Sequence, residues 1–194
     1  MKKEIITLAF ISACMFSFAQ NSIPNGNFET WNSSSYDIPQ NYVQCSNTNA
    51  YFSNLAFNLT KVADPYHGSF AARIVTEGSG NNANFGYFIN TDPNQGGKNP
   101  KQWPGGFPYN HKPTGIRGYY KSAIASPDSA RLLIIFRHSG VDTTMFAFGL
   151  SGTHSTYTLF QFPISLPSTP DTVILGITSS DFSNSSSNAA NGSM

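Results

Sequence analysis

The chain has 194 residues with 11 basic and 10 acidic side chains, and it is rich in Phe, Tyr, Gly and Pro. A nearly neutral chain without basic runs argues against nucleic acid or an anionic membrane as its main partner. Aromatic side chains together with many Ser, Thr and Asn favour an all-β domain with polar loops.

Residues 1–19 have the pattern of a secretory signal peptide. Two lysines precede an apolar run over residues 5–18, and the small residue Ala19 fits a cleavage site. The run is too short to anchor the chain across a bilayer. A lipoprotein signal at Cys14 is the alternative. We expect cleavage after Ala19, which leaves Cys45 without an internal disulfide and directs the protein to the outside or to the outer cell surface.

Residues 20–180 form one predicted domain of short strands separated by Pro, Gly and Asp turns. About nine strands are expected, a number typical of a β-sandwich. Only residues 47–58 are a weak candidate for a helix. Residues 181–194 are polar, and we expect a loop before a closing strand that the chain lacks. The predicted strands are a segment around Phe28 and residues 56–62, 70–76, 85–90, 114–121, 131–138, 144–150, 157–162 and 172–178.

Two of these strands differ in their side-chain pattern. Residues 131–137, RLLIIFR, are apolar on both faces, which predicts a central strand covered on each side. Residues 115–121, GIRGYYK, alternate instead, and successive side chains of a strand point to opposite faces. We therefore expect an outward side that is made of Arg117, Tyr119 and Lys121.

Residues 91–113 form a long segment without a strand pattern. Loops of this length inside a compact domain are usually functional or disordered. The aromatic residues Trp103, Phe107 and Tyr109 argue against disorder. A functional loop is therefore the expectation.

Five segments carry a family resemblance: IPNGNFETWN (23–32), KVADPYHGSFAARIVT (61–76), GGFPYNHKPTGIRGYYKS (105–122), PDSARLLIIF (127–136) and PDTVILGITSS (170–180). In this order they are similar to secreted Bacteroidetes-type proteins with a carbohydrate-metabolism or carbohydrate-binding-like jelly-roll domain. The resemblance implies an antiparallel, galactose-binding-like β-sandwich outside the cell, often followed by a type IX secretion sorting tail.

The resemblance also implies a role for Glu29. In such domains a first-strand glutamate ligates a structural calcium ion together with an aspartate of the last strand, which we expect this chain to lack. Backbone oxygens near Gly68 and Ser69 would supply further ligands, because calcium takes several oxygens. The alternative is a carboxylate that is solvated or bonded to nearby backbone amides.

Aromatic and polar side chains of the loop and of the alternating strand are candidates for a glycan site. Sugar recognition needs flat aromatic surfaces and a few polar groups that hold hydroxyls. The alternative is that each ring only packs against the domain. The candidates are Trp103, Tyr109 and Tyr119 for stacking, with His111, Arg117 and Lys121 as donors.

Catalytic patterns are missing from the sequence. It has no HExxH pair, no Cys/His cluster and no GxSxG elbow. A glycosidase needs two positioned carboxyl groups, and no pair is singled out. We therefore predict a secreted, non-catalytic module that binds a glycan or cell-surface polysaccharide. The alternatives are a structural or adhesive surface module and a carbohydrate-active enzyme.

Three Asp-Ser or Asp-Thr pairs resemble the O-glycosylation pattern of this bacterial group. The acceptors would be Ser129, Thr143 and Thr172. The alternative is ordinary turn chemistry at the start of a strand.

Overall fold

The computed structural model describes residues 23–53, 55–78, 83–95, 99–138 and 142–181. The predicted signal peptide and most of the polar tail lie outside the described residues. Among the residues described, no helix is long and apolar enough to cross a bilayer.

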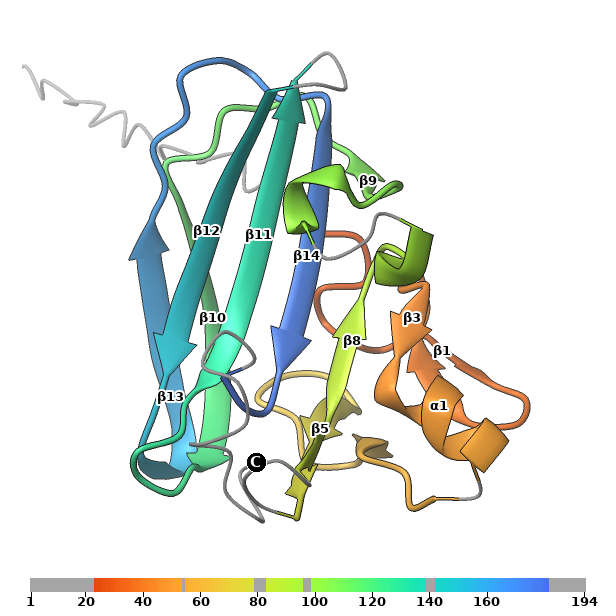
Figure 1. The fold of residues 1–194 in the computed structure, drawn as a ribbon. Helices are drawn as coiled ribbons and strands as arrows, with labels where there is room; N and C mark the ends of the chain where they lie inside the picture. The colour runs from red at the N-terminus through yellow and green to blue at the C-terminus, as the bar shows by residue number, and fades with distance from the viewer. Residues whose placement is uncertain (1–22, 54, 79–82, 96–98, 139–141, 182–194) are drawn as a thin grey trace, which may run out of the picture.

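The larger sheet has six antiparallel strands (Figure 1). Their spatial order is β12 (Asp142–Leu150), β11 (Ala130–His138), β14 (Thr172–Thr178), β8 (Tyr87–Ile89) and β3 (Gln44–Cys45). The short β9 (Phe107–Pro108) pairs with the start of β14.

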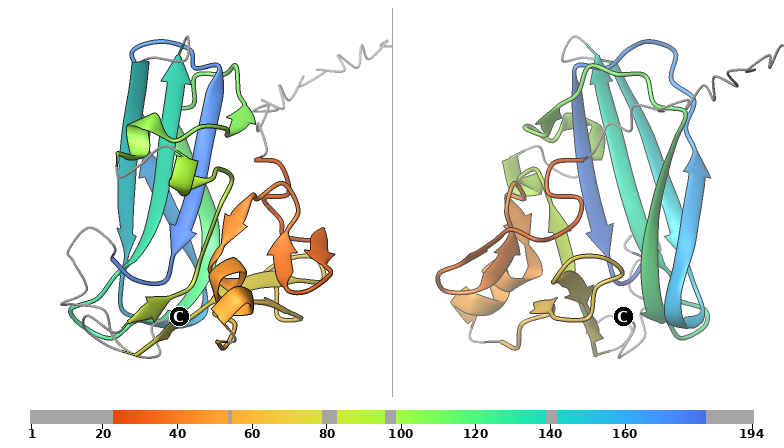
Figure 2. Two further views of the ribbon diagram at one scale, coloured as in Figure 1. Left: turned by 45° about the vertical axis from the view of Figure 1, so that its right-hand side comes forward. Right: turned by 180° about the vertical axis from the view of Figure 1, so that it is seen from behind.

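The second layer consists of two-stranded antiparallel ribbons rather than one continuous sheet. The longest, β10 (Gly115–Ala123) with β13 (Thr153–Pro163), lies behind the larger sheet (Figure 2). The others pair β1 (Trp31–Ser33) with β2 (Asp37–Pro39), β4 (Leu59–Val62) with β5 (Ala71–Ile74), and β6 (Thr76–Glu77) with β7 (Asn84–Phe85). The helical segments are α1 (Ser46–Ser53) and the 3₁₀ turns η2 (Pro93–Gln95) and η3 (Pro100–Gln102).

The main core fills the space between the layers. Leu132, Ile134 and Phe136 of β11 face Phe160 and Phe162 of β13 within one buried cluster. The intervening residues of β11 point to the outer face of the larger sheet, where a second, smaller cluster is buried: Ile89, Leu133, Ile135 and Ile174, with Tyr87 and Trp103 packed against it. The predictions of an antiparallel β-sandwich and of a central β11 covered on both sides are confirmed.

The predicted strand around Phe28 is wrong. Phe28 has a φ of 56° and its N–H donates to Asn25 O at 3.0 Å, so the chain turns there and pairing begins only at Trp31. The ring of Phe28 nevertheless packs edge-on against Phe88 in the main core, with the ring centroids 5.5 Å apart. Apolar character at this position therefore indicates burial but not strand geometry.

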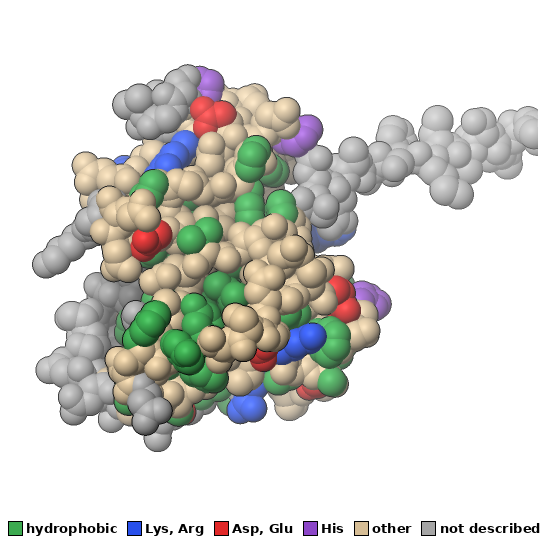
Figure 3. Space-filling model, turned by 90° about the vertical axis from the view of Figure 1, so that its right-hand side faces the viewer, with side chains coloured by type: hydrophobic (Ala, Val, Ile, Leu, Met, Phe, Trp, Pro, Cys, Tyr) green, Lys and Arg blue, Asp and Glu red, His purple; other side chains and the backbone are tan. Residues whose placement is uncertain are grey.

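The side of the molecule that carries α1 exposes several large apolar side chains. Val43 is 60 % exposed, Phe52 80 % and Leu55 58 %. Hydrophobic side chains are gathered in the lower part of this face in Figure 3. Residues 38–60, which carry these side chains, contain no Asp, Glu, Lys or Arg.

Candidate functional site

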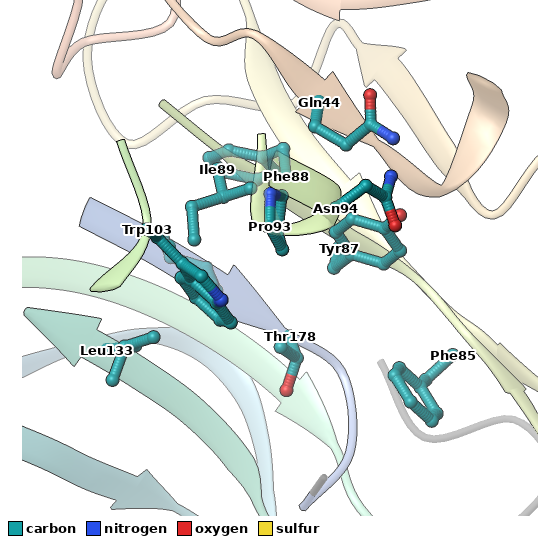
Figure 4. A pocket seen from close by; sticks show the side chains of 12 residues that line it. Gln44, Phe85, Tyr87, Phe88, Ile89, Pro93, Asn94, Trp103, Leu133 and Thr178 are labelled. Atoms are coloured by element: carbon teal, nitrogen blue, oxygen red, sulfur yellow. The ribbon is translucent and has the colours of Figure 1, made fainter. Parts of the chain in front are cut away.

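A groove of about 230 Å³ lies on the outer face of the larger sheet, between β8, β14 and the 3₁₀ turns (Figure 4). Figure 4 shows the indole of Trp103 on one side of this hollow and the rings of Tyr87 and Phe85 on the other, with the Asn94 and Gln44 amides near Tyr87. None of the described residues that line it carries a charge. They are Gln44, Phe85, Tyr87, Phe88, Ile89, Pro93, Asn94, Trp103, Leu133, Gly176, Ile177 and Thr178.

The buried side chain of Asn90 positions one wall of the groove. Its Nδ2 donates to Val173 O at 3.1 Å, and its Oδ1 accepts from Leu175 N at 2.8 Å. The side-chain amide of Asn90 therefore continues the hydrogen bonding between β8 and β14 just past the end of β8. Residues 93–95 and Trp103 lie over the outer face of the sheet, and β9 then pairs with β14.

Gly106 allows the return of this segment. It has a φ of +104°, and a Cβ there would lie 2.7 Å from Thr172 Cγ2 and 2.8 Å from Val173 O. Only glycine combines this backbone conformation with such a close approach to β14.

Trp103 packs against the outer face of the larger sheet and also borders the groove. Its ring is half-buried against the outer cluster of Ile89, Leu133, Ile135 and Ile174, so packing accounts for part of its surface. The remainder borders the hollow. The described part of the 91–113 segment thus places an aromatic side chain over the sheet.

Tyr87 contributes a protonated phenol to the groove. Burial raises the pKa of Tyr87 above its ordinary value, and the charges of Cys45 and Asp92 raise it further. The hydroxyl therefore keeps its proton at neutral pH. Aromatic walls with neutral amides and hydroxyls match a polyhydroxylated, uncharged ligand better than an ionic one.

Tyr109 and His111 are not part of this groove. Tyr109 is half-buried, its ring centroid lies 5.9 Å from that of Phe136 in the main core, and burial raises its pKa. His111 is exposed and lies with its ring centroid 5.9 Å from that of Tyr109. The structure therefore does not bring these two candidates together with Trp103.

Arg117, Tyr119 and Lys121 lie on the outer face of the β10–β13 ribbon. Arg117 and Tyr119 are exposed and Lys121 is half-buried, as the alternating pattern predicts. This face and the Trp103 groove are the two opposite outer surfaces of the sandwich. The six predicted glycan-binding residues are thus divided among three places.

Glu29 is bonded to backbone amides. Its Oε1 accepts from Ser69 N at 2.9 Å and from Phe70 N at 3.1 Å. These two hydrogen bonds hold the pKa of Glu29 below its ordinary value of 4.5. Gly68 has a φ of +86°, and a Cβ there would lie 2.2 Å from the same oxygen.

The carboxylate of Glu29 therefore ties the first segment of the domain to the loop before β5. Calcium takes several oxygen ligands, and calcium binding at Glu29 stays a prediction. In the described part of the chain, no three or more His, Cys, Asp or Glu side chains are grouped so that they could hold a metal ion.

Two aspartates are buried near the start of β11. Asp128 accepts from Ser180 Oγ at 2.6 Å and from Ser129 N at 2.7 Å, and Asp181 forms an ion pair with Arg131. Neither the groove nor a second hollow of about 340 Å³ at Phe136, His138 and Leu166 is lined by a described Asp or Glu. These two hollows therefore give no support to the enzyme alternative, which stays a prediction.

The three candidate O-glycosylation residues, Ser129, Thr143 and Thr172, are all half-buried. Ser129 N donates to the carboxylate of Asp128, which is the turn chemistry given as the alternative.

Most of the groove residues were not predicted. Gln44, Tyr87 and Asn94 come from three separate segments, and nothing local marks them as neighbours. Only the unusual length of the 91–113 segment pointed to this region.

No family model and no curated protein matches the chain.

Proposed function

We propose that the protein is a secreted, non-catalytic β-sandwich module that binds a glycan in the groove beside Trp103. The observation that carries the proposal is a concave site with aromatic walls and uncharged polar groups, Gln44, Asn94 and Thr178, at its edge. Sugar rings present apolar C–H faces that pack on aromatic rings, while their hydroxyls take amide donors and acceptors.

We further propose a galactose-binding-like jelly-roll topology and a place at the outer cell surface, reached by type IX secretion. The support is the family resemblance of the five sequence segments, together with the antiparallel sandwich. A signal peptide at residues 1–19 belongs to the same proposal.

Calorimetric titration with soluble neutral hexasaccharides of glucose, mannose, galactose and xylose tests this function. We expect one of them to bind, and Asn94→Ala to weaken binding without lowering the melting temperature, because Asn94 is on the edge of the groove. Trp103→Ala should weaken binding further, by about tenfold, the loss typical of an aromatic anchor. Asn110→Ala, a change of an exposed asparagine outside the groove, is the matched control. Wild-type affinity at every site in both groove variants would contradict the assignment.

A structural or adhesive module that contacts other proteins is the second candidate. The exposed apolar side chains around α1, with Phe52 80 % accessible, favour it, because contiguous apolar surface of this kind marks interaction sites. Sedimentation of the wild type against a Phe52→Ser, Leu55→Ser variant tests it. Self-association of the wild type that the double variant abolishes supports this candidate. A wild type that stays monomeric at high concentration contradicts self-association through this surface.

A further inference from the structure

A second aromatic surface lies on the other side of the sandwich from the groove. It is formed by Tyr119, Lys121 and Tyr157 of the β10–β13 ribbon and by Asp64 and Tyr66 of the turn that follows β4, and we name it the tyrosine platform. Tyr66 is 42 % exposed and Tyr119 45 % exposed. Tyrosines with this much accessible surface are not needed as core residues.

Ring contacts hold the platform in one arrangement. Tyr66 stacks on Tyr119 with the ring centroids 3.7 Å apart and the planes 17° from parallel. Tyr157 lies 5.7 Å from Tyr66, with its plane tilted by 59°. The three rings therefore form one continuous surface built from three distant parts of the chain.

Polar contacts fix the same turn to the ribbon. Lys121 Nζ lies 2.8 Å from Asp64 Oδ2 and 4.7 Å from the ring centroid of Tyr157. The hydroxyl of Tyr157 donates to the backbone oxygen of Asp64. A ligand would find these side chains already ordered, so binding would cost little conformational entropy.

The chemistry of the platform fits a neutral, hydroxylated ligand. The ammonium group of Lys121 is balanced by Asp64, so these two groups give no net charge to attract a phosphate backbone or an anionic surface. A hydrogen bond with Tyr119 raises the pKa of Tyr66, which keeps that phenol protonated at neutral pH. Ring faces, phenol donors, an ammonium group and a carboxylate acceptor together offer what sugar C–H faces and hydroxyls require.

We propose that the tyrosine platform is a second glycan-binding surface, so that one molecule binds two sugar chains on opposite faces. The ligand class rests on the proposed function, whereas the site is separate from the groove. One straight glycan chain cannot occupy two sites that face in opposite directions. The two sites would bind two neighbouring glycan chains and cross-link them. Multivalency would then strengthen binding to a polysaccharide.

The stoichiometry of the hexasaccharide that binds best, measured by calorimetry, tests the proposal. We expect two sites per wild-type molecule, one site in Asn94→Ala or Trp103→Ala, and one site in Tyr119→Ala. Tyr66→Ala, a change in the turn rather than in a strand, should have the same effect as Tyr119→Ala and guards against misfolding of the strand variant. Tyr51→Ala, at a tyrosine of α1 that is 48 % exposed, is the matched control and should keep both sites.

The outcomes separate this inference from the proposed function. A single site that is lost in the groove variants and kept in both platform variants overturns the inference and leaves the proposed function standing. A single site that is lost only in the platform variants supports the platform and overturns the groove. Absence of binding by every hexasaccharide overturns both.

Discussion

Asn90 should be among the most sensitive polar positions of the domain. It is 2 % exposed, and its side chain pairs with Val173 O and Leu175 N, two backbone groups in the middle of the larger sheet. Asn90→Ala removes both hydrogen bonds and leaves a buried carbonyl and a buried N–H unpaired. Each such group costs about 1–3 kcal/mol, so for the two groups together the free energy of unfolding should fall by roughly 2–6 kcal/mol.

Urea unfolding followed by intrinsic fluorescence measures this loss. In a domain of this size each 1 kcal/mol corresponds to about 2–4 °C in melting temperature, so the melting temperature should also fall by roughly 4–24 °C. Asn110→Ala makes the same chemical change at an exposed position and should stay within about 0.5 kcal/mol of the wild type. Equal unfolding midpoints for the two variants would refute the reasoning that these side-chain bonds complete the sheet.

Three further changes test how the domain is held together. Glu29→Gln weakens the bonds to Ser69 N and Phe70 N. Because the pKa of Glu29 is lowered, its contribution to stability is present above its ordinary pKa of 4.5 and is lost as the pH falls through the lowered value. The variant should therefore melt below the wild type at pH 7 and approach it in acid. Gly68→Ala should destabilise the domain by about 1–2 kcal/mol, measured by urea unfolding, because alanine disfavours a left-handed backbone. Tyr42→Phe should leave stability unchanged or raise it by about 1 kcal/mol, because the buried Tyr42 hydroxyl has no hydrogen-bond partner among the described residues.

Each of these changes has an outcome that contradicts its premise. A Glu29→Gln difference that persists unchanged at pH 3 would show that the charge of the carboxylate does not matter. Wild-type stability of Gly68→Ala would mean that the loop adopts another backbone conformation. A marked loss of stability in Tyr42→Phe would show that its hydroxyl makes a bond in solution.

The long strands could be predicted from the sequence because their burial pattern is local. β14 coincides with the predicted residues 172–178, and β11 is central because RLLIIFR has no polar face. The two-residue strands β3 and β9 could not be predicted in this way. They are strands only because β8 and β14 lie beside them, a contact that no local pattern encodes.

The candidate sites show the same limit. Alternation correctly placed Tyr119 and Lys121 on the outer face of β10, but the sequence carries no sign that Tyr66 folds back onto them. The number and chemistry of the aromatic residues could be read directly. Their grouping into a groove and a platform depends on the packing of segments distant in the chain.

The most direct test of the central claim is an NMR titration of the ¹⁵N-labelled protein with the hexasaccharides. The two tryptophans, Trp31 and Trp103, give two indole N–H signals, and a Trp31→Phe variant identifies that of Trp103. Glycan binding in the groove predicts saturable shifts of this signal and of the Asn94 amide, with little change at the Trp31 indole. Shifts confined to residues outside the groove, or none at millimolar sugar, would contradict it.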